Sequence, residues 1–237
     1  MRTAHNYLIF GNVNTRDFGV WISGTGTFDA PERDISFVSV PGRNGSLTID
    51  NGCFKNIKVS YPAFIPKDFP NKMAEFRARM RALPGYQRLE DTYTPDLYRM
   101  AVFVDAMKPK TTAYNAAAEF DLDFNCKPQR YLKIGDEWIT VSSGDSLRNP
   151  TPYEALPILR VYGTGTFYVG GTPVQITEST DYTDIDCELQ DAYRGLNNRN
   201  AYVKLLNGVF PSLPAGNTGI TYTGITRIDV MPRWYTI

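Results

Sequence analysis

The densest group of chemically capable side chains is a run of carboxylates near residue 185. It consists of Asp181, Asp184, Asp186, Glu188 and Asp191. Calcium takes about six to eight oxygen ligands, usually from a loop with a sharp glycine turn. Here the acids alternate along a predicted strand, so three of them share one face. We therefore expect a solvated or partner-facing strand surface, with a weak cation site as the alternative.

Residues for nucleophilic or metal-assisted catalysis are scarce. The single histidine, His5, offers no triad and no histidine-rich zinc site. Cys53, Cys126 and Cys187 are widely spaced and odd in number, which favours reduced, buried thiols over a disulfide framework. The phosphate-binding sequences GxxxxGK[ST] and GxGxxG and the GxSxG elbow of hydrolases are absent. The sequence predicts no enzyme, no cofactor and no metal; a glycosidase or peptidase is the least favoured alternative.

Charge and hydropathy exclude two further classes. The 237 residues include 25 Lys plus Arg and 25 Asp plus Glu, so the formal net charge is zero. Nucleic-acid binders usually carry a basic excess or stripe, and none is visible. No apolar run approaches the roughly 18 residues of a membrane helix, and the N-terminal apolar stretch is too short for a signal peptide. We expect no specific binding of nucleic acid, no membrane insertion and no secretion.

Aromatic side chains are the remaining candidates for ligand binding, because they could stack on sugar rings. Most aromatic residues bury large areas in cores or interfaces, so we expect few of them to form a sugar platform. The candidates are Trp21, Trp138, Trp234, Tyr131, Tyr153, Tyr162 and Tyr168.

The elements that must position these groups are mainly strands. Residues 118–126 alternate strictly, with apolar side chains on one face and acidic side chains on the other, which predicts a half-buried strand. Residues 183–190 repeat the pattern, with Ile185 and Leu189 expected inward and Asp184 and Asp186 outward. The segment 225–231 alternates similarly. Shorter candidate strands are 35–40, 57–61, 100–105, 158–162, 166–169, 174–177 and 202–206.

One helix and one hairpin stand out from this pattern. Over residues 70–83 the apolar residues recur at helical spacing and Pro70 suits the first turn, which predicts a helix ended by Pro84-Gly85. Asn44-Gly45 lies between two β-rich runs and predicts a hairpin turn. The segment 207–224, rich in Gly, Pro, Asn and Thr, is expected to be a long loop.

The whole chain resembles the distal tail protein (Dit) family of long-tailed, siphovirus-type bacteriophages and prophages. The resemblance rests on an opening FGNVNTRDFGVWISG (Phe10 to Gly24), on the hairpin VPGRNGSL (Val40 to Leu47), and on the block from the helix to FNCKPQRY (Phe124 to Tyr131). It continues in NPTPYEALPILRVYGTG (Asn149 to Gly165) and in the closing FPSLPAGNTGITYTG and PRWYTI. Together these segments span nearly the whole chain in the family's order.

The resemblance implies a mainly β protein of two β-sandwich domains: a belt domain with one helix over residues 1–130 and a galectin-like domain over 131–237. It implies a structural role without catalysis, as a homohexameric ring hub in the baseplate at the distal end of the virion tail. The implied partners are the tail tube protein, the tail-tip or tail-associated lysin protein and, in some members, a receptor-binding protein. The chain would be made in the host bacterial cytoplasm, and phage DNA would pass through the channel without specific binding.

Candidate contacts between ring subunits are Arg43 and Asn44 in the hairpin and Arg77 and Arg81 on the helix. A charge at a hairpin tip has no core role, so Arg43 is the stronger candidate. The alternatives are that Asn44 and its neighbouring glycines only shape the turn and that the helix arginines form a solvated face. A carbohydrate-binding module of a host-adhesion device is the alternative function, because fold alone does not fix function.

Overall fold

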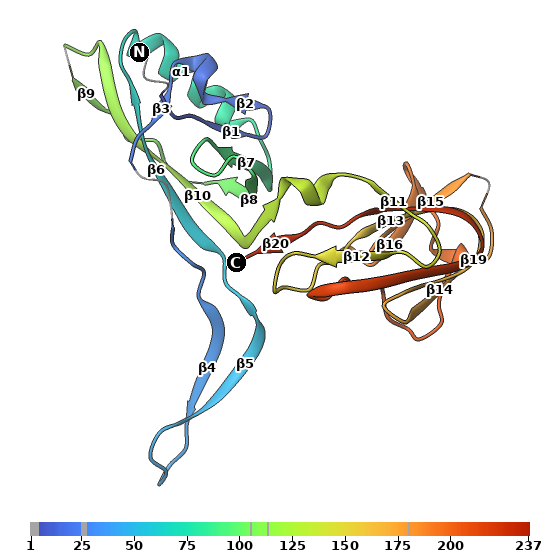
Figure 1. Cartoon of the computed structure of the whole chain (residues 1–237). Helices are drawn as coiled ribbons and strands as arrows, with labels where there is room; N and C mark the ends of the chain where they lie inside the picture. Colours follow the sequence, from blue (N-terminus) through green and yellow to red (C-terminus); the bar gives the residue numbers. More distant parts are fainter. Residues whose placement is uncertain (1–4, 25–27, 105, 113, 180) are drawn as a thin grey trace. The chain divides into compact units, whose positions relative to one another are not determined.

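The computed structural model describes residues 5–24, 28–104, 106–112, 114–179 and 181–237 (Figure 1). Within these residues the protein is mainly β and has one α-helix, as the sequence predicts. The chain divides into two compact units: the residues up to Arg130 together with Ile237, and Tyr131–Thr236. None of the described helices is long and apolar enough to cross a membrane.

The first unit is built on one sheet with the strand order β2-β1-β7-β8-β10-β6-β3, and β9 pairs with β10. A short 3-10 helix, Thr15–Phe18, connects β2 to β3. The strands are β1 (Leu8–Phe10), β2 (Val13–Asn14), β3 (Trp21–Ile22), β6 (Ile57–Ile65), β7 (Gln87–Asp91), β8 (Leu97–Phe103), β9 (Lys110–Thr112) and β10 (Ala117–Leu132).

The strand predicted over 118–126 is the centre of β10. Its apolar side chains, Phe120, Leu122, Phe124 and Cys126, are buried as expected. It pairs antiparallel with β6 from Ala118 opposite Ile65 to Cys126 opposite Ile57, so the inward residues of both strands share one core.

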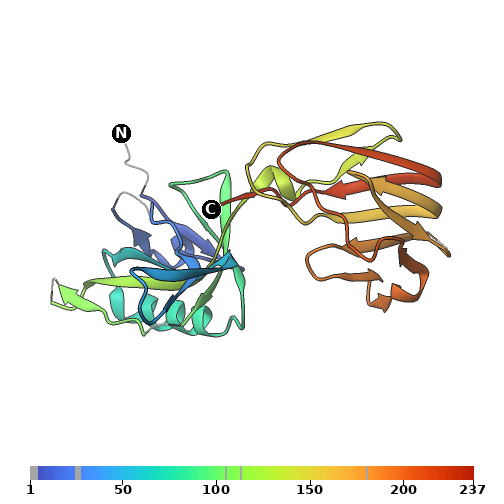
Figure 2. The same ribbon diagram turned by 90° about the horizontal axis from the view of Figure 1, so that it is seen from below.

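The predicted helix is α1 (Phe69–Arg81), which lies against one face of this sheet (Figure 2). Met73, Phe76 and Met80 are its buried residues, and they pack into the same core as the inward residues of β6 and β10. Pro70 occupies the first turn, where its missing N–H costs no helical hydrogen bond. The helix ends two residues before the predicted limit, at Arg81.

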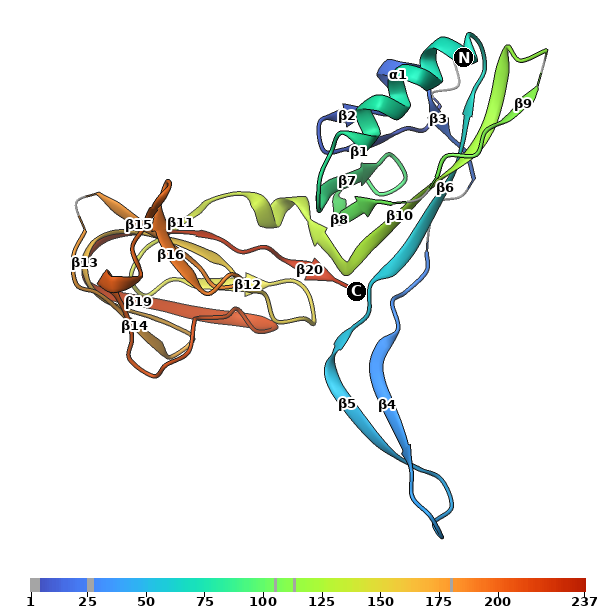
Figure 3. The same ribbon diagram turned by 180° about the vertical axis from the view of Figure 1, so that it is seen from behind.

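The predicted hairpin forms a separate two-stranded sheet of β4 (Arg33–Ser39) and β5 (Ser46–Phe54), which we call the arm. Figure 3 shows the arm projecting from the rest of the first unit. The turn between the strands contains Gly42 and Gly45, whose φ angles of 78° and 81° belong to the left-handed region that favours glycine. The Asn44-Gly45 signal therefore marks a real turn.

The second unit has the strand order β11-β19-β13-β15-β16-β17, with β12 on β19 and with β14 between β13 and β18. Two 3-10 helices, Lys133–Asp136 and Asn200–Tyr202, flank these strands. The strands are β11 (Ile139–Val141), β12 (Ser146–Asn149), β13 (Ile158–Val169), β14 (Thr172–Ile176), β15 (Tyr182–Asp186), β16 (Asp191–Arg194), β17 (Asn197–Asn198), β18 (Val203–Leu205), β19 (Gly216–Met231) and β20 (Tyr235–Thr236).

The structure corrects the predicted limits of strands in this unit. The segments 158–162 and 166–169 are strands as predicted, but they belong to one strand, β13, whose pairing with β19 shifts register near Gly163. A Cβ atom on Gly165 would lie 2.1 Å from the carbonyl oxygen of Thr223, so β19 requires glycine there. The second half of the predicted loop 207–224 is the start of β19, where Thr218 and Ile220 are buried. Alternation of threonine with apolar residues outweighs the turn-forming composition there.

Phe76 tests how far the first unit depends on the helix. Its ring is fully buried and lies 5.7 Å from that of Phe18 and 6.4 Å from that of Phe120, measured between centroids. We expect Phe76→Ala to lower the free energy of unfolding by about 3–5 kcal/mol, because it removes contacts and leaves a cavity. Arg79→Ala, on the exposed face of the same helix, should change it by less than about 0.5 kcal/mol. Urea unfolding of both variants measures the difference, and equal effects would contradict the packing.

Candidate interaction surfaces

The arm exposes apolar side chains on both of its faces. Cross-strand pairing places Val38 opposite Leu47 and Ser36 opposite Ile49 on one face. Phe37 lies on the other face and is 70% exposed, and Leu47 is 50% exposed. A two-stranded ribbon has no third layer to cover either face. The arm is thus an apolar surface that the described residues of the first unit leave open.

Polar contacts hold the base of the arm. Arg33 Nε donates to Asp50 Oδ2 at 2.7 Å, and the Gly52 N–H donates to Asp50 Oδ1 at 2.8 Å. The hydrogen bond from the Gly52 N–H has the largest effect on the pKa of Asp50 and lowers it; desolvation opposes this, and the Arg33 guanidinium lowers the pKa further. Asn51 Nδ2 donates to Asp34 at 2.9 Å. These hydrogen bonds, and not a core, hold the two strands of the arm together at its base.

The four candidate contact residues fall into two separate patches. Arg43 and Asn44 lie in the exposed turn at the arm tip, where the Arg43 N–H donates to the Val40 carbonyl at 3.2 Å. Arg77 and Arg81 lie on the exposed face of α1. The arm tip and α1 are at opposite ends of the first unit in Figures 1 and 3, so the structure does not bring the two pairs together.

The outward face of β10 is acidic in part. Glu119 and Asp121 are exposed there, whereas Asp123 forms an ion pair of 3.0 Å with Lys58. Lys108 and Lys110 lie alongside, because they line the same shallow depressions as Asp121. The face therefore carries both signs of charge.

The carboxylate run in the second unit differs from the expectation. Asp184 and Asp186 are buried, and each forms a two-bond ion pair with an arginine. Arg160 donates to Asp184 at 2.7 and 2.9 Å, and Arg233 donates to Asp186 at 2.8 and 2.7 Å. Arginines take the place of a cation, and no metal-binding group of acidic, cysteine or histidine side chains occurs among the described residues.

The prediction that Asp184 and Asp186 point outward to solvent failed because side chains cover both faces of β15. The strand also ends at Asp186, before the predicted limit at residue 190. Ile185 fills the core as predicted, but the opposite face carries the arginines. After Asp186 the chain turns: the N–H groups of Glu188 and Leu189 both donate to Asp186 Oδ1 at 3.0 Å. Leu189, predicted inward, is 70% exposed in this turn. A strict alternation cannot continue through an Asx-type turn.

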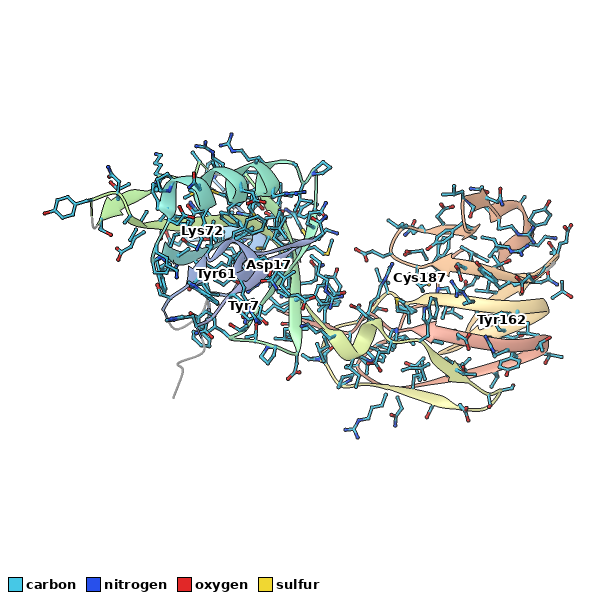
Figure 4. All side chains as sticks on the ribbon, turned by 90° about the horizontal axis from the view of Figure 1, so that it is seen from above. Tyr7, Asp17, Tyr61, Lys72, Tyr162 and Cys187 are labelled. Carbon is cyan, nitrogen blue, oxygen red and sulfur yellow. The ribbon has the colours of Figure 1, made fainter. Side chains whose placement is uncertain are left out.

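Guanidinium groups cover two of the candidate sugar-stacking rings. The Cζ atom of Arg160 lies 4.6 Å from the ring centroid of Trp138, and that of Arg227 lies 4.2 Å from the centroid of Tyr162. The arginine beside Tyr162 also bonds Asp229 at 2.9 Å. Tyr162 is labelled in Figure 4. These contacts occupy one face of each ring.

The other aromatic candidates are spread over different environments. Trp234 and Tyr131 are buried, and burial raises the pKa of Tyr131 above its usual range. Tyr153 stacks on Tyr235 at 5.6 Å between centroids, and Trp21 packs 5.3 Å from the His5 ring. Tyr168 is exposed. They do not gather into one shelf.

The three thiols are all unpaired, and their environments differ. Cys126 and Cys187 are buried as predicted, whereas Cys53 is exposed on the arm. The prediction failed for Cys53 because the arm has no core. Burial raises the pKa of Cys126 to about 11, against the opposing charge of Arg99, and that of Cys187 to about 12.

Comparison with known proteins decides the fold. No protein-family model and no curated protein matches the chain. The crystal structure of the SPP1 Dit (gp 19.1) protein, described as a paradigm of the hub adsorption apparatus in phages that infect Gram-positive bacteria, matches with a TM-score of 0.72. It is 10% identical, and the match covers 96% of this chain and 98% of that chain. This chain has the distal tail protein fold.

Structures of the phage P2 baseplate in its activated conformation match this chain more loosely. With calcium the TM-score is 0.54, and the match covers 96% of this chain and 98% of that chain. With strontium the TM-score is 0.52, and the match covers 95% of this chain and 97% of that chain. Both matched chains are 10% identical to this one. The resemblance inferred from sequence motifs is confirmed at the level of the fold.

The buried pair of Asp186 and Arg233 predicts a large difference between two Asp→Asn variants. Asp186→Asn removes the two short bonds to the Arg233 guanidinium, whose side chain is 20% exposed, and leaves it only the longer 3.4 Å ion pair with Glu188; it should cost about 3 kcal/mol. Asp181→Asn removes one partner of the exposed pair with Arg194 and should cost less than about 1 kcal/mol. Denaturant unfolding measures both; equal costs would show that the buried pair has no special weight.

The thiol environments predict selective alkylation. At pH 8 a thiol of pKa about 11 is a thiolate in roughly one molecule in a thousand, and only the thiolate reacts. Iodoacetamide should therefore modify Cys53 at a rate typical of an exposed thiol, while Cys126 and Cys187 react only after unfolding. Mass spectrometry of peptides from native and denatured samples identifies the sites. Modification of Cys126 in the native protein would contradict its burial.

Proposed function

We propose that this protein is a structural component of a phage tail: the distal tail protein, which forms a homohexameric ring hub in the baseplate. The observation that carries the proposal is the likeness to the SPP1 Dit protein over nearly the full length of both chains. A match of both units in one order is a stronger argument than a match of one β-sandwich, since isolated sandwiches serve many functions.

In this proposal the first unit is the belt domain, residues 1–130, and the second is the galectin-like domain, residues 131–237. The ring joins the tail tube to the tail-tip or tail-associated lysin protein and, in turn, to a receptor-binding protein. It is made in the bacterial cytoplasm and resides at the virion tail tip. No step in this role needs catalysis.

A ring of identical chains needs two different patches that fit each other. The first unit offers two: the arm with Arg43 and Asn44 at its tip, and the basic face of α1 with Arg77 and Arg81. Half-exposed apolar residues such as Val38 and Leu47 support contact through the arm, because a solvated ribbon of this kind is unstable and prone to pairing. We assign both patches to subunit contacts.

The mixed charge of the outward face of β10 suits a wall along which DNA slides. Glu119 and Asp121 would repel phosphates, and the nearby lysines would limit the repulsion. We place this face toward the channel. The carbohydrate-binding alternative gains no support from the second unit, since arginines already cover Trp138 and Tyr162.

Light scattering with negative-stain imaging of the same fraction tests the proposal. We expect a mass of about 160 kDa, six times the 26.7 kDa of one chain, or twice that for a double ring, with ring-shaped particles. If rings need a template, they should form when the tail tube or tail-tip protein is added. A chain that stays monomeric alone and with both partners would refute the proposal.

Charged replacements on the arm should separate assembly from folding. Val38→Lys combined with Leu47→Glu keeps a complementary cross-strand pair but removes two apolar contacts. We expect subunit association to weaken at least about tenfold while the unfolding transition is unchanged. The matched control is Leu189→Lys with Leu196→Glu, which alters two exposed apolar side chains of the second unit. Analytical ultracentrifugation over a concentration series measures association; equal behaviour of the two double variants would remove the arm from the interface.

A further inference from the structure

The first unit contains a cavity of about 120 Å³. It is lined by residues of β6, β7, β8 and β10 and of the turn after β7, among them Tyr61, Asp91, Tyr93, Arg99 and Arg130. Apolar side chains, including Leu89 and Leu97, complete the wall. Tyr61 is labelled in Figure 4. None of the assembly patches described above supplies a residue to this cavity.

Arg99 is the unusual member of this lining. Alternation along β8 places it on the same side as the buried Ala101, and its exposed fraction is only 6%. Both terminal nitrogens, Nη1 and Nη2, are buried and have no hydrogen-bond partner among the described residues. The buried hydroxyl of Tyr93 lies near the Asn6 side chain but makes no hydrogen bond of good geometry among the described residues. A buried charge that lacks a partner is costly, so its presence calls for an explanation, and a bound ligand is one.

The nearest carboxylate does not satisfy Arg99. Asp91 Oδ2 accepts from the Tyr61 hydroxyl at 2.7 Å. Its Oδ1 accepts from the N–H groups of Tyr93 and Thr94 at 2.9 and 2.8 Å and from the Thr94 hydroxyl at 3.1 Å. Asp91 therefore shapes the turn beside the cavity. Both of its carboxylate oxygens accept hydrogen bonds from that turn or from Tyr61.

The local charge balance favours an anion. Burial, followed by the charge of neighbouring Arg130, lowers the pKa of Arg99, while Asp91 acts in the opposite direction with smaller effect. Two guanidinium groups thus lie near one carboxylate in a largely buried site. An additional negative charge would offset both the free-energy cost of burying the charged Arg99 and its repulsion by Arg130.

We propose that this cavity is a carboxylate-binding site in which Arg99 and Tyr93 hold the ligand. Two terminal nitrogens of one planar guanidinium match the two oxygens of a carboxylate, and the Tyr93 hydroxyl supplies a third donor, once the ligand replaces the side-chain contacts that close off these three atoms. The apolar part of the wall suits a carboxylate on a short aliphatic or aromatic group rather than a phosphate. The ligand is an acidic side chain or chain end of a neighbouring copy, or a small carboxylic acid.

NMR titration with sodium acetate tests the site in the unassembled full-length chain, kept so by the Val38→Lys and Leu47→Glu replacements on the arm. Sodium chloride replaces acetate in the reference, so ionic strength is constant. We expect saturable shifts of the Arg99 Nε–Hε signal and of the Tyr93 and Thr94 amide signals, with dissociation on the order of millimolar for so small a ligand. No saturable shift, or an equal response to chloride, would overturn the proposal.

Variants connect the response to the two donors. Arg99→Lys keeps the charge but loses the paired donors, and should weaken acetate binding about tenfold. Tyr93→Phe should weaken it several-fold, and it keeps the proposal testable if the Arg99 variant does not fold. Arg79→Met, on the exposed face of α1, is the control and should leave the titration unchanged. Wild-type affinity in both site variants would contradict the assignment.

Assembled particles distinguish the two sources of the carboxylate; this comparison rests on the proposed ring, whereas the titration of the isolated chain does not. If a neighbouring copy supplies the carboxylate, assembly itself should shift the Arg99 signal and prevent acetate from binding. If the ligand is a small acid, particles should bind acetate as the isolated chain does. Either result supports the site. Failure to assemble would count against the proposed ring and would leave the acetate result intact.

Discussion

The first unit depends on the strict alternation of side chains along β10. Over 118–126 the strand buries Phe120, Leu122, Phe124 and Cys126 and turns its acidic residues away. A register slip of one residue would exchange the two sets and bring Asp121 and Asp123 into the core, at a cost no packing could offset. The pairing of β10 with β6 and the position of α1 follow from this register, since β6 and α1 both contribute side chains to the core on the same side of the sheet.

The second unit meets a different constraint, because two of its aspartates are buried. Asp184 and Asp186 are compensated by Arg160 and Arg233, each through two hydrogen bonds. Such pairs contribute geometric specificity more than net stability. Arg99 in the first unit is the contrast: it is buried, whereas Arg160 and Arg233 are partly exposed, yet both of its terminal nitrogens lack a partner among the described residues. That contrast separates a structural arginine from one that can bind a ligand.

The parts predicted correctly are those with local signals. The β10 alternation, the helical spacing of Met73, Phe76 and Met80, and the Asn44-Gly45 turn all act within a few residues. The errors concern long-range facts. Nothing near Asp186 indicates Arg233, which is 47 positions away. Likewise, the β-rich hairpin sequence contains no sign that a third strand is missing, so the exposure of Phe37, Val38 and Cys53 could not be foreseen. Arg99 gave no signal, because an arginine within an apolar strand usually points outward.

The arm also gives a physical reason for closure of the proposed ring. Burying a half-exposed apolar side chain contributes on the order of 1 kcal/mol, so several arm residues together contribute a few kcal/mol per contact. In an open chain of subunits one arm and one receiving patch stay exposed at the ends, whereas a closed ring leaves neither. Closing the ring therefore adds one more subunit contact without recruiting another subunit from solution. The same geometry limits growth, since a closed ring offers no free arm on which filaments could extend.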